Sequence, residues 1–193
     1  MHHTDTIILG IDPGTNIMGY GLLGVKNGKE LYLIEMGVLH LEKYDDHFTK
    51  LKKILDKVLQ LIVIHQPHMV ATEAPFYGKN AQSMLKLGRA QGMALAAALQ
   101  HDLPIFEYLP RVVKQQITGR GNATKEEVAT MVGHTITIPT TPEYLDATDA
   151  LAVAICHYYF TIKKIPLPIK TSKKSTKKSS WSNFITENPD RQL

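Results

Sequence analysis

Three apolar runs open the chain and predict three strands. Residues 6–11 (TIILGI) are typical of a short buried strand, and the runs at 19–25 and 30–41 predict two more. Asn27-Gly28 lies between the second and third runs and is a strong signal for a tight hairpin turn. We therefore expect the chain to begin as an antiparallel meander of three strands.

Helical and strand-like segments alternate after this meander. Residues 46–65 carry apolar side chains at i, i+3, i+4 and i+7, which predicts an amphipathic helix that ends before Pro67. Residues 68–75 and 104–110 predict a fourth and a fifth strand. The Ala- and Leu-rich residues 81–101 between them predict a helix.

Three further helices are expected in the C-terminal half. They lie near 110–118, near 124–133 and from about 141–143 to Lys164, and Thr124 is a candidate cap for the second of them. A strand meander followed by alternating helices and strands implies a mixed five-stranded sheet flanked by helices, which is an α/β fold.

Length and composition indicate one ordinary globular domain. The chain has 193 residues, of which 44% are hydrophobic and 21% charged. Its single cysteine excludes an internal disulfide, and no apolar run is long enough to span a bilayer. We also see no basic region followed by an apolar one at the N-terminus, so we expect a cytoplasmic protein without a membrane association.

The positive charge is concentrated at the C-terminus. Residues 163–193 carry seven lysines and one arginine against two acids, so their formal charge is +6, whereas that of residues 1–162 is −2. We therefore divide the chain into a domain at 1–164 and a Lys- and Ser-rich tail at 165–193 that is expected to be disordered when free. Such a tail would add salt-sensitive affinity for a polyanion.

Four carboxylates occur where a charge is locally costly. Asp12 ends the first strand and Glu73 ends the fourth, while Asp146 and Asp149 share one face near the start of an otherwise apolar helix. Strand ends in α/β sheets form a natural crevice for ligands. A final helix laid across that crevice would bring its two acids close to the other two.

Carboxylates gathered in this way favour a divalent cation. Two charges about 4 Å apart repel by roughly 4 kcal/mol at an effective dielectric near 20. Oxygen ligands favour Mg²⁺, with Mn²⁺ able to substitute, over zinc. Two such ions can activate water and stabilise the leaving oxygen at phosphorus, which is the chemistry of a phosphodiester nuclease. Taken singly, Asp12 could merely belong to an Asp-Pro-Gly turn, and Asp146 could merely favour a helix dipole.

Five segments of the chain carry a family resemblance, namely ILGIDPGTNIMGYGLL, Glu73-x-x-Phe76, LKLGRAQG, VKQQITGRGNATKEEV and DATDALAVAICH. Together they resemble the RuvC family of Holliday-junction resolvases, within the RNase H-like nuclease superfamily. The resemblance implies that Asp12, Glu73, Asp146 and Asp149 are catalytic acids that hold the metal, with two ions in each site. It also implies a homodimer that makes paired symmetric cuts in a four-way DNA junction during recombination and repair, together with a branch-migration motor complex.

Aromatic and basic side chains near these motifs are candidate DNA contacts. An aromatic after the fourth strand could stack on an unpaired base, and the lysines beside the glycine loop could position a phosphate or stabilise charge at the scissile phosphate. The plainer alternatives are a core position for Phe76 and solvated surface charges for the basic residues. The candidates are Phe76, Tyr77, Lys79, Lys86, Arg89, Lys114 and Lys125.

Two further features allow a plain and a functional interpretation. Gly88 and Gly92 lie four residues apart on an Ala-rich helix, so they permit close helix contact either in a dimer or within one subunit. His157 lies near the acidic helix face, where a structural histidine is favoured over a functional one.

Three other function classes remain open at this point. Another RNase H-like nuclease would act on a different branched or RNA-containing substrate. An actin-like nucleotide-binding protein would use the GIDPGT segment as a phosphate loop, but the chain is short for two lobes and has no second glycine-rich motif. A non-catalytic junction-binding protein would not need all four acids.

Overall fold

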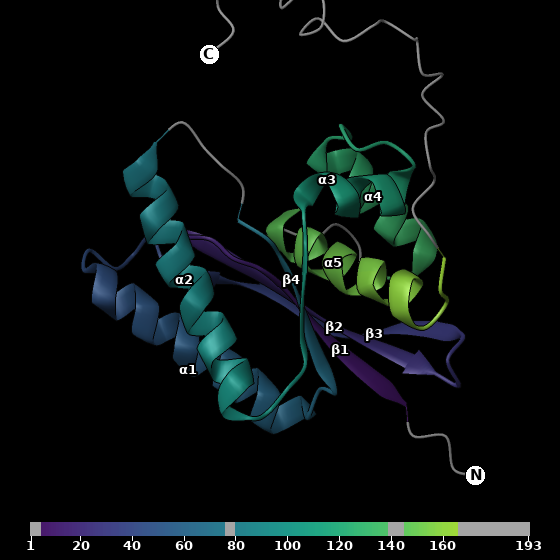
Figure 1. The fold of residues 1–193 in the computed structure, drawn as a ribbon, viewed down its shortest axis with the longest axis horizontal. Helices are drawn as coiled ribbons and strands as arrows, with labels where there is room; N and C mark the ends of the chain where they lie inside the picture. Colours follow the sequence, from purple (N-terminus) through teal and green to yellow (C-terminus); the bar gives the residue numbers. More distant parts are fainter. Residues whose placement is uncertain (1–4, 76–79, 139–144, 166–193) are drawn as a thin grey trace, which may run out of the picture.

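A mixed five-stranded sheet forms the centre of the molecule, as the computed structural model shows for residues 5–75, 80–138 and 145–165 (Figure 1). The strand order is β3-β2-β1-β4-β5. The strands are β1 (Thr6–Asp12), β2 (Ile17–Lys26), β3 (Glu30–His40), β4 (Met69–Glu73) and β5 (Ile105–Tyr108). The helices are α1 (His47–His65), α2 (Ala81–Gln100), α3 (Pro110–Thr118), α4 (Lys125–Thr135) and α5 (Leu145–Thr161).

The first three strands form the expected antiparallel meander. β2 pairs with both β1 and β3, and both residues of the Asn27-Gly28 turn have positive φ angles, of 52° and 68°. Two consecutive positive φ angles are characteristic of the hairpin turn that joins strands with native twist. The expected meander and its turn are therefore confirmed.

The parallel half of the sheet brings two acids to one edge. β4 lies parallel to β1, with Ile11 in register with Thr72. Asp12 and Glu73 are the last residues of these two neighbouring strands. Parallel strands end at the same edge of a sheet, so both carboxylates project from that edge.

The helices cover the two faces of the sheet in separate groups. α1 and α2 lie on one face, and α5 lies on the other with α3 and α4 packed over it (Figure 1). Each group has its own buried apolar cluster, one centred on Ile54 and Val58 of α1 and the other on Leu151 and Ile155 of α5.

α5 packs against the sheet more closely than an ordinary helix because the sheet offers glycines beneath it. A Cβ atom at Gly10 of β1 would collide with the backbone oxygen of Ala150, and one at Gly19 of β2 would collide with that of Asp146. Gly19 is the register partner of Asp12. The start of α5 is thus held directly over the end of β1.

Helix ends follow local signals in the sequence. Thr124 caps α4 as expected, and Glu127 completes a capping box by accepting a hydrogen bond from the backbone of Thr124. Pro110 begins α3, which Gly119 ends in a left-handed conformation at φ 76°.

Several element boundaries differ from the sequence-based expectation. The strand expected at 68–75 covers only Met69–Glu73. The strand expected at 104–110 covers only Ile105–Tyr108, because Pro110 starts a helix instead. The last helix was expected to reach Lys164 but ends at Thr161, and Lys164 has a positive φ of 53°. The proposed tail falls almost wholly outside the described residues. Among the described helices, none combines the length and apolar character that crossing a bilayer requires.

Candidate active site

Three carboxylates from two elements converge at the edge of the sheet. Asp12 ends β1, and Asp146 and Asp149 lie in the first two turns of α5. One ligand oxygen from each of them lies within 4.8 Å of the other two. The Gly19 contact described above explains this convergence, because it seats the backbone of Asp146 against the strand beside Asp12.

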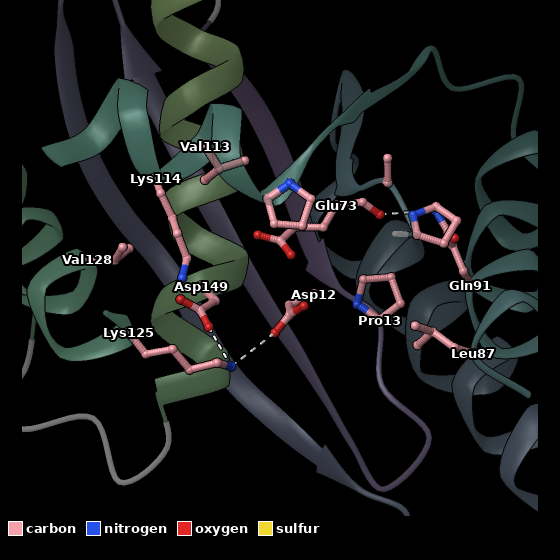
Figure 2. Close-up of a pocket in the computed structure, with 13 residues that line it drawn as sticks. Asp12, Pro13, Glu73, Leu87, Gln91, Val113, Lys114, Lys125, Val128 and Asp149 are labelled. Carbon is pink, nitrogen blue, oxygen red and sulfur yellow. Dashed lines mark hydrogen bonds and ion pairs between the residues drawn. The ribbon is translucent and has the colours of Figure 1, made fainter. Parts of the chain in front are cut away.

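Glu73 lines the same pocket from the end of β4 but lies outside this tight group of three (Figure 2). Its backbone oxygen accepts a hydrogen bond of 3.1 Å from Nε2 of Gln91, which also donates to Glu107 at 2.8 Å. Gln91 is 4% exposed on the inner face of α2, so this amide ties α2 to the ends of β4 and β5. Gln91 was not predicted from the sequence as a site residue, although a polar residue on the apolar side of a helix can indicate one.

The ammonium group of Lys125 lies inside the acidic cluster. Its Nζ is 2.7 Å from carboxylate oxygens of both Asp146 and Asp149 and 4.0 Å from one of Asp12. Figure 2 shows the side chain reaching from the start of α4 to a point between Asp12 and Asp149. Lys125 was expected to contact DNA phosphate, and its observed partners are instead the three acids.

Lys114 lines the same pocket from α3. Its Nζ donates a hydrogen bond of 2.7 Å to the backbone oxygen of Ala123, which holds the loop before α4 against α3. Apolar side chains from α2, α3 and α4 complete the walls of the pocket, namely Leu87, Val113 and Val128.

Two other candidate DNA contacts, Lys86 and Arg89, do not line the acidic pocket. Lys86 lines a separate polar groove, and Arg89 is exposed on α2. Phe76, Tyr77 and Lys79 lie outside the described residues. Pro75, which precedes Phe76, is an exposed residue that lines the pocket beside Glu73.

The carboxylates that line the pocket outnumber the lysines that line it. Burial, followed by the neighbouring Glu73, raises the pKa of Asp12 well above its usual value. Burial and the charge of Asp149 raise the pKa of Glu73 to about 7. Burial also raises the pKa of Asp149, although hydrogen bonding from Lys125 acts in the opposite direction. Clustered, partly desolvated carboxylates of this kind are typical of functional sites.

Lys125 compensates for only part of this charge. Burial alone would lower the pKa of its ammonium group, but hydrogen bonds to Asp146 and Asp149 raise that pKa overall. A single cation therefore stabilises a group of acids whose combined charge exceeds its own. The carboxylate donor set fits a hard divalent cation such as Mg²⁺ or Mn²⁺, and the position of the ammonium shows that the cluster attracts a cation.

His157 is a structural residue, in agreement with the sequence-based preference. It is fully buried, and its Nδ1 shares a hydrogen bond of 2.7 Å with the hydroxyl of Tyr108. The ring of Phe106 packs against it with centroids 4.2 Å apart. Burial lowers the pKa of His157 to about 4, so the ring is neutral near pH 7.

Gly88 and Gly92 do not serve packing within the subunit. A Cβ atom at either position would meet no atom within 4 Å among the described residues. The interpretation of these glycines as close intramolecular contacts is therefore wrong, and both lie on the exposed side of α2.

Comparison with known proteins agrees with this architecture over most of the chain. The family model described as crossover junction endodeoxyribonuclease RuvC matches residues 8–157. A protein of that name from Cytophaga hutchinsonii is 53% identical over 189 residues, which cover 97% of this chain and 88% of the relative.

Solved structures extend the agreement to three dimensions. The structure described as T. thermophilus RuvC in complex with Holliday junction substrate has a TM-score of 0.76 at 30% identity, covering 85% of this chain and 99% of that chain. The yeast mitochondrial Holliday junction resolvase Ydc2, at 14% identity and a TM-score of 0.60, shares the fold. The expected α/β class is thus confirmed. Since the family match covers residues 8–157, with all four acids, this chain belongs to the RuvC family of crossover junction endodeoxyribonucleases.

Proposed function

We propose that this protein resolves four-way DNA junctions by metal-dependent hydrolysis of phosphodiester bonds, in recombination and repair. The observation that carries the proposal is the cluster of Asp12, Asp146 and Asp149, with Glu73 in the same pocket, in a member of this family. The T. thermophilus relative, described in complex with a Holliday junction substrate, supports the choice of DNA substrate.

The four acids are the proposed metal-binding and catalytic residues. Asp12, Asp146 and Asp149 offer oxygens close enough to share one ion, and Glu73 would contribute to a second. Bound Mg²⁺ or Mn²⁺ would activate water and neutralise charge developing at phosphorus. The carboxylates would hold the ions rigidly, because each projects from the end of a strand or from the buried start of α5.

Lys125 and Lys114 are proposed to act on the DNA phosphate. Both line the acidic pocket, and their positive charges would stabilise the additional negative charge of a scissile phosphate. Lys125 would first have to leave its present carboxylate partners, because the same oxygens would hold the metal. Phe76 and Tyr77, with Lys79, Lys86 and Arg89, remain proposed DNA contacts.

A homodimer would supply the two cuts that resolution requires. One catalytic centre cuts one strand, and a two-fold dimer would present two centres to a two-fold symmetric junction. The outer side of α2 is the proposed interface. Its exposed residues at i, i+3, i+4 spacing form an apolar stripe, in which Leu85 and Leu99 are 65% and 64% exposed. The stripe consists of Leu85, Gly88, Gly92, Ala96 and Leu99.

Gly92→Leu tests this interface without disturbing the subunit. No atom lies within 4 Å of the position a Cβ would take, so the larger side chain leaves internal packing unchanged. We expect sedimentation to show a shift from dimer to monomer, and a cruciform plasmid to be nicked rather than linearised. Gln60→Leu, on the exposed side of α1, is the matched control and should remain dimeric. A wild-type protein that is monomeric on the junction would contradict the proposal.

Cleavage assays on different DNA structures test the function as a whole. We expect paired nicks in a synthetic four-way junction with Mg²⁺, and none with EDTA or on linear duplex. Equal cleavage of an RNA–DNA hybrid and a junction would instead indicate another RNase H-like nuclease. A cytoplasmic location and cooperation with a branch-migration motor are proposed on the same family grounds.

A further inference from the structure

A second groove lies beside the acidic pocket and is lined mostly by polar side chains. It is formed where the turn after β1 meets the first turns of α1 and α2. Asn16 contributes from the turn, His47 and Lys50 from α1, and Ser83 and Lys86 from α2. None of these residues belongs to the lining of the acidic pocket.

The groove carries two lysines whose charges are poorly compensated. Lys50 Nζ lies 3.5 Å from the side-chain oxygen of Asn16, which is a long contact to a neutral group. Lys86 is exposed and makes no ion pair with any residue in the described part of the chain. Asp45 is the one acidic residue in the lining, so the lysines outnumber the acids.

An anionic group is the ligand that this lining favours. Lys50 and Lys86 approach the groove from two different helices, and neither ammonium group has an ion-pair partner among the described residues. An anionic oxygen in the groove would therefore attract both lysines.

The groove lies next to the acidic pocket along two elements. Asp12, the last residue of β1, lines the pocket, and Asn16 lines the groove four residues later in the turn after β1. On α2, Leu87 lines the pocket while the preceding residue, Lys86, lines the groove. Both segments therefore lead directly from the acidic pocket to the groove.

We infer that this groove binds the phosphodiester backbone of the cleaved strand, near but not at the scissile phosphate. Lys50 of α1 and Lys86 of α2 hold one or two phosphates from opposite sides. The inference rests on the proposed nuclease function and adds Lys50 to its DNA contacts. Contacts of this kind position the strand and carry no sequence information.

Salt dependence of binding tests the two lysines. Wild type, Lys50→Gln, Lys86→Gln and the double variant are titrated with a four-way junction in EDTA over a range of salt concentrations. Each single change should reduce the slope of log K against log [salt] by about 0.9, and the double change by about twice that. Lys26→Gln is the matched control, because Lys26 is an exposed lysine at the opposite end of β2 from the groove, and its slope should equal that of wild type.

Neutral phosphate analogues then locate the contact. Methylphosphonates are placed singly at successive positions on both sides of the cleavage site. We expect at least one position near the cut where neutralisation weakens binding of wild type several-fold but does not weaken binding of the double variant. Circular dichroism melts confirm that the variants are folded, which Gln at exposed or half-buried helix positions should allow.

A double variant with the wild-type salt slope would overturn the inference, as would methylphosphonates that affect wild type and double variant equally at every position. Failure of the proposed function has a different signature. In that case wild type itself would fail to cleave junctions with Mg²⁺, or would bind linear duplex as tightly as a junction.

Discussion

The helices on the two faces of the sheet are buried to different extents. On one face, α1 buries a single stripe of residues, including Ile54 and Val58, and leaves its other side in water. On the opposite face, twelve consecutive residues of α5, numbered 147–158, are buried. The acidic residues lie on or beside α5, so the chemistry is placed in the most deeply packed part of the molecule.

The acidic site lies on the α5 face, where burying a charge costs free energy, whereas the α1 face contributes apolar packing. Carboxylates near a buried helix are partly desolvated, which raises the pKa values of Asp12 and Asp149. The one acid on α1, Asp56, is exposed and pairs with Lys52 at 3.0 Å. Changes to the acids on the α5 face should therefore alter metal binding, whereas a change of Asp56 on α1 should not.

Removing a cluster carboxylate is expected to have the largest effect. Asp12→Asn should reduce cleavage by more than about 10³-fold, because a metal ligand contributes several kcal/mol to charge stabilisation. Junction binding in EDTA should persist, since the side chain serves the reaction. Asp56→Asn on α1 is the control and should cleave as wild type does. Cleavage by Asp12→Asn at the control rate would contradict the assignment.

Gly19→Ala should come next, because it forces the start of α5 away from β2. The added methyl would collide with the backbone oxygen of Asp146, and overpacking of this kind costs about 1–3 kcal/mol. We expect a lower melting temperature and weaker Mn²⁺ binding in calorimetry, as the acids move apart. Gly133→Ala on α4 is the control, since its nearest neighbour would lie 3.6 Å away and alanine favours the helix. Unchanged Mn²⁺ affinity in Gly19→Ala would show that α5 does not depend on this contact.

Lys125→Gln should act on metal binding and cleavage in opposite directions. Loss of the ammonium frees the oxygens of Asp146 and Asp149, so Mn²⁺ affinity without DNA should rise by roughly 3–10-fold, or about 1 kcal/mol. Cleavage should fall, because the cation is also needed at the phosphate. Lys57→Gln on α1 should change neither quantity. A drop in Mn²⁺ affinity in Lys125→Gln would mean that the lysine supports the metal site.

The smallest expected effect is the change of folding stability with pH in the absence of metal. The pKa of Glu73 is about 7 in the folded protein, above the usual value near 4.3 for an unfolded chain. The folded state then binds more protons between these values, so stability falls as pH rises from about 4.5 to 7 and levels above it. We expect a melting temperature a few degrees lower at pH 8 than at pH 5.5 from this residue.

A substitution at Glu73 and the addition of Mg²⁺ each isolate the contribution of Glu73 to this pH dependence. Glu73→Gln should flatten the difference in melting temperature, and Mg²⁺ should raise the value at pH 8 more than at pH 5.5. Glu30→Gln is the control, an exposed acid at the start of β3 that does not line the acidic pocket. A Glu73→Gln protein with the full pH difference would assign the effect to other acids.

The sequence allowed the order of elements to be predicted because most of them carry local signals. The periodicity of α1, the Asn27-Gly28 turn and the cap at Thr124 are all fixed by neighbours in the chain. The four acids were identified because each was out of place in an apolar context. That Asp12, Asp146 and Asp149 form the tight group, with Glu73 beside it, depends on how α5 sits on β1 and β2.

Long-range contacts account for what the sequence did not reveal. α5 is apolar on all sides, so its pattern does not indicate which face meets the sheet, and only the glycines beneath it settle its position. Lys125 was expected to face DNA because nothing nearby in the chain suggests an acidic partner. Its closest partners are 21 and 24 residues away, on another helix.

The capping box of α4 affects how readily the ammonium group of Lys125 can leave the acidic cluster. Thr124 fixes the helix start, so Lys125 is the first residue of α4, where the peptide dipoles present their positive end. A cation at that point is disfavoured by its own helix, by about 0.3–1 kcal/mol at an exposed site. Among the described residues, the three acids are what hold Lys125 in place. If bound metal neutralised them, the helix dipole would favour movement of the ammonium away from α4.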